Sequence, residues 1–396
     1  MAAFRVPGYP ALWFSGAAGA FGWSVSLVAI SWITLQVTNS PFAVGVTFAA
    51  RLTPALLFGM PLGSLVDRHD RRTTLVAVSV AGCLAFLFIA ALAQVSGLGL
   101  LEIVVLSFGL GIADTLRGTA FQSYTFDLAG SAGATNAIAL SNLGGQLFGS
   151  VGAVIGGIVL AQAGASPTFL LAAIPAGLAA ILLAFGEHGT RVAAAPAPRL
   201  SPSASRSRSL ILRNRLVRVI ALVVIVGEIL GFSSITLYPS FARDVLDVDA
   251  GGLGVMSAAR AVGGVIGLLL LARLGFGGRG GLLLIGATVA FGLGLVAFSI
   301  STIFGLSLLL LAVVGCAASA LDTLGQSLIQ QAVGDQERGA AMGVWFFAIG
   351  FGPFGHLGLG AAASAVGAPL ALACSGLLLA LIGLALGTVK ELRTLP

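Results

Sequence analysis

The sequence predicts an all-α integral membrane protein with twelve transmembrane helices in two pseudo-symmetric six-helix bundles. Three observations lead to this fold class: the composition, the length of the apolar runs and an internal repeat. Only 9% of the 396 residues are charged, against about 25% in ordinary soluble domains, and 58% are apolar. A soluble fold has too little interior to bury so much apolar surface, so lipid must be the solvent for most of the chain.

The apolar runs have the length of membrane-spanning helices, because about 20 mostly apolar residues are needed to cross roughly 30 Å of hydrocarbon. They are continuous and do not alternate with period two, which favours helices over a barrel of strands. Twelve runs are predicted as spans, and Arg5 followed by an uncleaved apolar run indicates that the first is retained. The predicted spans cover residues 11–36, 42–64, 74–95, 99–122, 136–163, 167–186, 216–240, 251–273, 281–300, 303–328, 339–364 and 367–388.

An internal repeat divides the chain into two halves, 1–186 and 216–396. "VGVTFAAR" at 44–51 is similar to "LGVMSAAR" at 253–260, an offset of 209 residues, and "ADTL" at 113–116 to "LDTL" at 321–324, an offset of 208. Parallel six-helix repeats are typical of secondary transporters, whose site lies between the halves. The segment between them, 187–215, is rich in Pro, Ser and Arg and is predicted to be a flexible cytoplasmic linker. It serves either as an orienting tether or as a contact for anionic lipids.

Arginine residues collect in every second connection between the predicted spans and after the last one. The opposite connections hold only Arg243, beside three aspartates. This positive-inside bias predicts that both termini are cytoplasmic and that the protein lies in a bacterial-type inner membrane. The basic residues on the predicted cytoplasmic side are Arg68, Arg71 and Arg72, then Arg191 to Arg218, Arg273 and Arg279, Arg338, Lys390 and Arg393.

The turn between the second and third predicted spans reads "GSLVDRHDRR", residues 63 to 72. It resembles the signature of the major facilitator superfamily, G-x-L-x-D-R-x-G-R-R-x-x-L, except that Asp70 stands where that family has Gly. With the twelve spans and the repeat, the resemblance covers essentially the whole chain. The matching residues are Gly63, Leu65, Asp67, Arg68, Arg71, Arg72 and Leu75.

The resemblance implies a cytoplasmic gate formed by Gly63, Asp67, Arg68, Arg71, Arg72 and Asp127. Asp67 is expected to face the positive N-terminal end of the eleventh span, near 339–343, and Arg71 to pair with Asp127. The alternative is a positive-inside turn with solvated charges. The corresponding turn of the second half, "RLGFGGRGG", has no acid, so we expect one strong gate.

Three further stretches resemble the branch of drug and siderophore exporters that includes the macrolide and enterobactin efflux proteins. They are "PFAVGVTFAARLTPALLFGMPLGSLVDRHDRR", "YPSFARDVLDVDAGGLGV" and "GFGPFGHLGLG". This resemblance implies efflux. Antiporters of the superfamily often carry G-P-x-x-G-G in the fifth span, whereas "GAVIGG" at 152–157 has Ala153 in place of Pro, which weakens the expectation of antiport.

Ionisable side chains inside a bilayer are costly, so those in the predicted spans are candidates for proton coupling or substrate binding. Glu228 is our first choice for proton coupling, because a carboxyl group in a low-dielectric environment can exchange a proton near neutral pH. Its alternative role is an ion pair with Arg260. Asp114 and Asp322 occupy matching positions in the fourth and tenth spans, where they either line a cavity or act as packing elements. The three acids are expected to line a water-filled cleft between the halves.

The remaining candidates are basic. Arg51 and Arg260 end the repeated A-A-R and either brace neighbouring helices or orient anionic groups of a substrate. Arg117 lies one turn after Asp114 and is expected to help neutralise it. His356 in the eleventh span is either a proton relay or a structural hydrogen-bond donor.

Several function classes are excluded by what the sequence lacks. It has no G-x-x-x-x-G-K-[ST] run, and Lys390 is its only lysine, which argues against driving transport with ATP. No metal-ligand or nucleophile constellation is visible, so we expect no cofactor and no enzyme. The arginines lie between apolar segments, which favours membrane orientation over nucleic-acid binding.

We therefore expect a monomeric secondary transporter that works by alternating access with lipids around it. Protons moving inward would drive the efflux of an amphipathic organic molecule such as a drug, antibiotic or siderophore. The alternatives are a lysolipid carrier, an importer of a small metabolite, or a non-transporting receptor or scaffold with the same fold.

Overall fold

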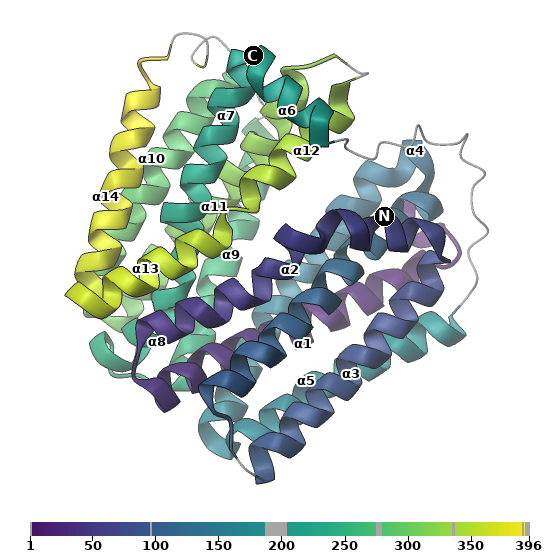
Figure 1. The fold of residues 1–396 in the computed structure, drawn as a ribbon, viewed down its shortest axis with the longest axis vertical. Coiled ribbons are helices and arrows are strands. Elements are labelled where there is room, and N and C mark those ends of the chain that lie inside the picture. Colours follow the sequence, from purple (N-terminus) through teal and green to yellow (C-terminus); the bar gives the residue numbers. More distant parts are fainter. Residues whose placement is uncertain are drawn as a thin grey trace. The chain divides into compact units, whose positions relative to one another are not determined.

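The computed structural model describes residues 2–95, 97–186, 204–274, 279–334, 337–389 and 392, and throughout these residues the regular structure is helical (Figure 1). The chain forms two compact units. Unit 1 comprises Met1–Asn39, Ala50–Ala197 and Asp247–Ala258, and unit 2 comprises Ser40–Ala49, Pro198–Leu246 and Ala259–Pro396.

The helices of the first half begin with a short 3-10 turn and include one very long element. They are η1 (Ala2–Arg5), α1 (Tyr9–Thr38), α2 (Pro41–Arg68), α3 (Arg71–Val95), α4 (Leu100–Ala163) and α5 (Ala165–Phe185). The long α4 is two helices joined at Gly130, whose φ of 65° and ψ of 172° are not helical. Glycine adopts this positive φ without the steric cost that a side chain would add, and the kink lies in the predicted connection between the spans 99–122 and 136–163, which is otherwise helical.

The second half contains more and shorter elements. They are α6 (Ala204–Arg213), α7 (Arg215–Val226), η2 (Gly227–Gly231), η3 (Phe232–Leu237), α8 (Tyr238–Ser240), η4 (Phe241–Val245), α9 (Ala250–Leu274), α10 (Gly280–Ser299), α11 (Phe304–Gln331), α12 (Arg338–Ile349), α13 (Gly352–Val366) and α14 (Ala368–Leu386).

Small residues bring the helices close together within each unit. In unit 1, α1 packs against α4 and α5, and a Cβ placed on Gly156 would lie 2.9 Å from the Cα of Val25. In unit 2, α10 packs against α14 and α11, and a Cβ on Gly376 would lie 2.7 Å from the carbonyl oxygen of Gly292. Backbone approach of this kind supplies the dispersion contacts that hold helices together in lipid.

The seventh predicted span, 216–240, is helical but not a regular α-helix. After α7 the chain passes through a π turn (η2), a 3-10 turn (η3), the short α8 and a second π turn (η4). Such turns change the register of the backbone hydrogen bonds, and side chains bond some of the carbonyls there. The hydroxyl of Ser233 donates to the Ile229 carbonyl at 2.6 Å, and that of Ser375 to the Leu230 carbonyl at 2.7 Å.

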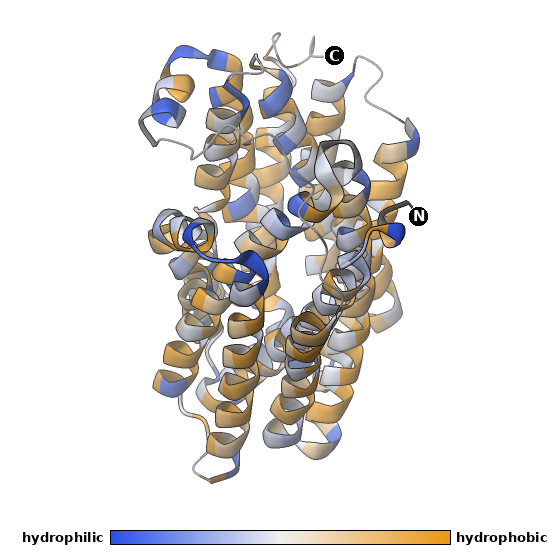
Figure 2. Ribbon diagram, turned by 90° about the vertical axis from the view of Figure 1, so that its right-hand side faces the viewer, coloured by the Kyte–Doolittle hydropathy of each residue, from blue (hydrophilic) through white to orange (hydrophobic). Residues whose placement is uncertain are grey.

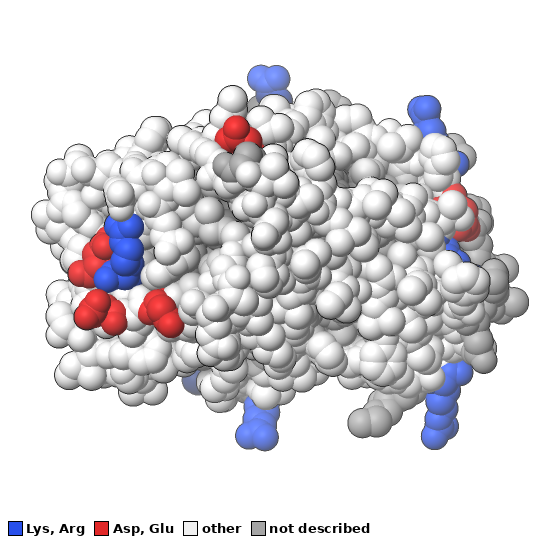
Figure 3. All heavy atoms as spheres, turned by 90° about the horizontal axis from the view of Figure 1, so that it is seen from below, with Lys and Arg blue, Asp and Glu red and all other residues white. Residues whose placement is uncertain are grey.

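Eleven helical segments among the described residues are long and apolar enough to cross a membrane. Hydrophobic residues run along most of the helices (Figure 2), and the charged side chains visible in Figure 3 are few, with one group of both signs at the left of the view. The predicted span 99–122 lies in the first part of α4 but is not among the eleven, so the number twelve stays a prediction.

Two predicted segments differ in detail from the structure. The span 339–364 is formed by two helices, α12 and α13, which are interrupted at Gly350 and Phe351 just before Pro353, a residue that cannot continue a helical hydrogen-bond ladder. Within the predicted linker, residues 204–213 form α6, and residues 187–203 lie outside the described part of the chain. The hydroxyl of Ser207 on α6 donates to the Ala340 carbonyl at 3.0 Å.

Candidate functional site

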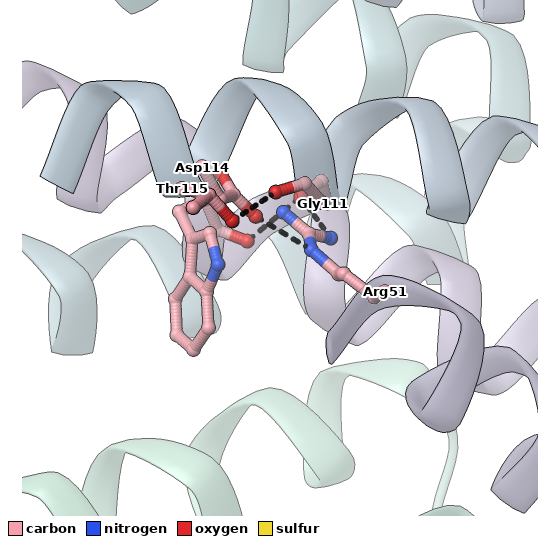
Figure 4. A network of polar contacts seen from close by, with 6 residues as sticks. Arg51, Gly111, Asp114 and Thr115 are labelled. Atoms are coloured by element: carbon pink, nitrogen blue, oxygen red, sulfur yellow. Dashed lines mark hydrogen bonds and ion pairs between the residues drawn. The ribbon is translucent and has the colours of Figure 1, made fainter. Parts of the chain in front are cut away.

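Unit 1 contains an ion pair between two predicted spans. The Nε of Arg51 on α2 donates to Oδ2 of Asp114 on α4 at 2.9 Å (Figure 4). Thr115 does not compete for the carboxylate, because its hydroxyl donates to the Gly111 carbonyl one turn earlier, at 2.8 Å. The pair therefore links α2 to α4 directly, and it was not among the contacts predicted from the sequence, which named only Arg117 as a residue that helps to neutralise Asp114.

Other groups of α1 complete the environment of the buried Arg51 side chain, which is only 6% exposed. Its Nη1 donates to the hydroxyl of Ser26 at 3.1 Å, and its guanidinium carbon lies 5.7 Å from the ring centroid of Trp23. A hydrogen-bonded guanidinium over an indole face is a favourable arrangement for a desolvated cation. These contacts are those of a bracing residue, one of the two roles expected for Arg51.

Arg117 also approaches α1, but it meets backbone instead of a carboxylate. Its Nη2 donates to the carbonyl of Ser15 at 2.9 Å and to that of Gly16 at 3.3 Å. The guanidinium fills the space beside Gly19, where any Cβ would collide with it. Asp114 is near enough to interact with Arg117 electrostatically, although its carboxylate is bonded to Arg51.

A cavity of about 50 Å³ opens among these side chains inside unit 1. Its charged lining consists of Arg51, Asp114 and Arg117, and Trp23 forms part of its wall. Most of the remaining lining is small or apolar. The other lining residues are Gly19, Gly22, Val78, Ser79, Gly82, Phe86, Leu110, Ala113, Ala176 and Ala179.

Unit 2 contains a second charge cluster, formed by Glu228, Arg260 and Asp322. Glu228 lies on the π turn η2, Arg260 on α9 and Asp322 on α11. The charged groups that act electrostatically on Glu228 are Asp322 and Arg260. The structure therefore brings together two acids and one arginine that are far apart in the sequence.

Glu228 and Arg260 do not form the ion pair that was the alternative role for Glu228, since neither belongs to any ion pair found among the described residues. The Arg260 guanidinium carbon lies 5.9 Å from the ring centroid of Phe232, and its Nε is buried without a hydrogen-bond partner in the described part of the chain. Two acids beside one incompletely bonded arginine leave a carboxyl that can take up or release a proton.

The two clusters share one plan, which extends the sequence repeat. "FGWS" at 21–24 corresponds to "LGFS" at 230–233, again at an offset of 209, and pairs Trp23 with Phe232 as the ring beneath each arginine. In both units a glycine of the neighbouring helix meets the arginine's own carbonyl, Gly111 at Arg51 and Gly315 at Arg260, although these glycines are 204 residues apart and are not counterparts in the repeat. Sequence analysis missed these aromatic partners, although the constant offset of 209 was a signal that could have found them.

Each cluster also contains a charged residue that the other lacks, Arg117 in unit 1 and Glu228 in unit 2. At the offset of 209, the counterpart of Glu228 is Gly19, and at the offset of 208 the counterpart of Arg117 is Gly325. The neighbours correspond as well, because Arg117 bonds the Ser15 carbonyl and a Cβ on Gly325 would lie 2.7 Å from Val224, the counterpart of Ser15. The charge cluster of unit 1 thus has two arginines and one acid, and that of unit 2 has one arginine and two acids.

His356 lies on α13. Its Nδ1 and the hydroxyl of Thr236 are 2.6 Å apart, and its ring stacks on Phe48 with centroids 5.1 Å apart and planes inclined by 7°. The side chain is buried. A buried imidazole with a hydroxyl partner and an aromatic neighbour fits the structural role better than the relay.

The charged turn at 63–72 holds neighbouring helices of unit 1 together. Arg71 forms the predicted ion pair with Asp127. Asp70 caps α3, because its Oδ1 accepts from the backbone N–H of Thr73 at 2.8 Å, which gives a local reason for an acid where the signature has Gly. The Asp67 side chain lies outside the described residues.

The other basic residues of this turn have different surroundings. Arg72 donates to carbonyls at the C-terminal end of α5, including that of Gly186 at 2.8 Å, where a helix favours cations. Arg68 is exposed, and the nearest atom to a Cβ on Gly63 would be Cγ2 of Thr119, at 4.0 Å. No group of three or more His, Cys, Asp or Glu suited to a metal ion occurs within the described ranges.

An all-helical membrane chain with a duplicated set of charges inside its helices is the architecture of a membrane transporter. The family model described as transmembrane secretion effector matches residues 1–395. The chain belongs to this family, within the major facilitator superfamily, as its signature indicated.

Known relatives and solved structures agree with this assignment. The enterobactin exporter EntS of Salmonella typhi is 28% identical over 375 residues, which cover 91% of this chain and 88% of that protein. EntS of Citrobacter koseri is also 28% identical, with 91% and 87% covered.

Among solved structures, a bacterial homologue of the human lysosomal transporter Spinster superposes with a TM-score of 0.77 at 14% identity, covering 98% of each chain. The nucleoside transporter NupG superposes with a TM-score of 0.71 at 17% identity, covering 97% of this chain and 100% of that one. At these identities the likeness establishes the fold.

Proposed function

We propose that the protein is a proton-coupled exporter of an amphipathic organic molecule, such as a drug, antibiotic or siderophore, and that it works by alternating access. Relatives named enterobactin exporters over nine tenths of the chain favour outward transport of a molecule of this kind. They also favour a bacterial inner membrane. The arginine distribution supports cytoplasmic termini, and we propose that the protein acts as a monomer.

One observation supports proton coupling above the others: Glu228 sits on a π turn inside a membrane-spanning segment without an ion-pair partner among the described residues. Asp322 and Arg260 interact with it electrostatically. An unpaired carboxyl in such a place is costly in its charged form, so it gains from binding a proton. In this mechanism Glu228 carries the proton, and the charges of Asp322 and Arg260 change the free energy that is needed to ionise its carboxyl group.

The proposal is tested with inside-out membrane vesicles, whose lumen corresponds to the outside of the cell. An acidic lumen should drive a fluorescent amphipathic cation, such as ethidium, and a fluorescent amphipathic acid into the vesicles, and a protonophore should abolish the accumulation. Accumulation of neither probe under any gradient would favour the receptor or scaffold. Movement in the opposite direction would favour an importer.

We also propose that the turn 63–72 acts as a cytoplasmic gate, with Arg71 paired to Asp127 as its described part. Replacing Asp67 by Asn should reduce transport to a small fraction of the wild-type rate, because the change removes the charge that the signature resemblance assigns to the gate. The protein should still insert in the membrane in normal amounts. Transport rate per inserted protein is the measurement.

Asp70→Asn is a matched control for this prediction. It is the same chemical change three residues away, and Asn caps helices as well as Asp does, so α3 should keep its cap. Equal transport by wild type and Asp67→Asn would show that the turn only orients the chain.

A further inference from the structure

The charge cluster of unit 1 has one positive charge more than its acids can neutralise. Arg51 and Arg117 face a single acid, Asp114, whose Oδ2 is already bonded to Arg51 at 2.9 Å. Within the described part of the chain, Arg117 has only the neutral carbonyls of Ser15 and Gly16 as hydrogen-bond partners, and no carboxylate lies within ion-pair distance of it. A guanidinium inside a membrane-spanning helix normally has a counter-charge.

The cavity beside this excess charge provides room for a counter-charge. Arg51 and Arg117 both line it, and three of its other lining residues, Gly19, Gly22 and Gly82, have no side chain to fill it. Its volume of about 50 Å³ is well below the ~150 Å³ cavity that accommodates a benzene ring. The space therefore suits a small charged substituent rather than an aromatic ring.

In the charge cluster of unit 2, the chain itself supplies a negative charge at the position that corresponds to Gly19 of unit 1. The counterpart of Gly19 is Glu228, and the counterpart of Arg117 is Gly325. An acid at position 19 would have neutralised Arg117 from within the chain. Glycine at this position instead leaves the positive charge to be met by something that enters the cavity.

We propose that the cavity between Arg51 and Arg117 binds an anionic oxygen group, a carboxylate or an acidic group of similar size, on the transported molecule. This subsite rests on the proposed function and narrows it to substrates with an acidic substituent. The apolar body of the molecule stays outside the cavity, where Trp23, which is 42% exposed, offers a flat aromatic surface. The guanidinium of Arg117 supplies the charge-assisted hydrogen bond.

Binding to the full-length protein in detergent, without any gradient, tests the subsite. The probes are 2-naphthoate and its uncharged isostere 2-naphthamide, and quenching of tryptophan emission reports binding. The wild type should bind naphthoate at least about tenfold more tightly than naphthamide, because a hydrogen bond between two charged groups is worth that ratio or more. Arg117→Gln should bring the ratio to about one, and Arg117→Lys should retain most of it.

Two further variants separate the loss of the charge from damage to the fold. Gly19→Glu should also abolish the preference, because its carboxylate takes the place of the ligand, while the flexible end of Arg117 moves to accommodate it. Arg273→Gln, which removes an exposed arginine of α9, should leave the preference unchanged. Thermal unfolding of each variant verifies that it is folded.

Equal affinity of the wild type for the two probes would overturn the subsite, and so would a full preference retained by both Arg117→Gln and Gly19→Glu. Failure of the proposed function looks different. A protein that prefers naphthoate in detergent but transports nothing under a pH gradient keeps the subsite and loses the transport mechanism.

Discussion

Replacing Glu228 by Gln should abolish the response of transport to a pH gradient. Gln has the shape of protonated Glu but cannot release a proton, so each cycle would move substrate without a coupled proton. A gradient of two pH units contributes about 2.7 kcal/mol per proton, which corresponds to roughly a hundredfold accumulation. We expect that accumulation to fall to about the level of simple equilibration, measured as the vesicle-to-medium ratio of the probe with and without the gradient.

Two controls make this result specific. Glu102→Gln is the same change at an exposed acid in the first turn of α4, and it should leave gradient-driven accumulation intact. Probe binding by Glu228→Gln in detergent should also remain, because the variant keeps the size of the side chain. If Glu228→Gln still accumulates the probe in proportion to the gradient, the coupling proton is carried elsewhere.

Replacing Asp114 by Asn should destabilise unit 1 by about 3 kcal/mol, the lower end of the range for breaking a buried ion pair. The lower end applies because Asp114 is 36% exposed, although Arg51 is only 6% exposed. The cost arises because Arg51 stays in the interior without its carboxylate. The midpoint of thermal unfolding in detergent should fall by several degrees.

The chain offers a matched surface pair for comparison. Asp244→Asn breaks the Arg243–Asp244 pair, in which Asp244 is 49% exposed, and should change stability by less than about 0.5 kcal/mol. The double variant Arg51→Met with Asp114→Leu should be more stable than Asp114→Asn alone, because it leaves no unpaired charge inside. A midpoint for Asp114→Asn as high as that of Asp244→Asn would contradict the bracing role of the pair.

The sequence was sufficient for the features that depend on composition and local pattern. Apolar length placed the spans, and the family resemblance implied that Arg71 pairs with Asp127, an acid at the inner end of the fourth span. It was insufficient for contacts between helices. Spacing along one helix suggested that Arg117 helps to neutralise Asp114, and the two do interact electrostatically, but it did not show that the ion-pair partner of Asp114 is Arg51 on a different helix.

The irregular helix of span seven and the contacts of His356 could not be predicted from the sequence, and the reason is the same for both. Gly227, Gly231 and Pro239 are visible in the sequence, but side chains from distant parts of the chain also stabilise the irregular helix of this segment. One of them is Ser375, whose hydroxyl donates to the Leu230 carbonyl. The surroundings of His356 are likewise set by Thr236 and Phe48. Partners more than a hundred residues away leave no mark in a local pattern.

The duplicated plan of the two clusters makes each half of the chain a natural reference for the other. Trp23 and Phe232, or Arg51 and Arg260, are placed by the same architecture, so a substitution at one site has a twin experiment 209 positions away in the same polypeptide. A difference between twins then reports on the charges and contacts that distinguish the two clusters.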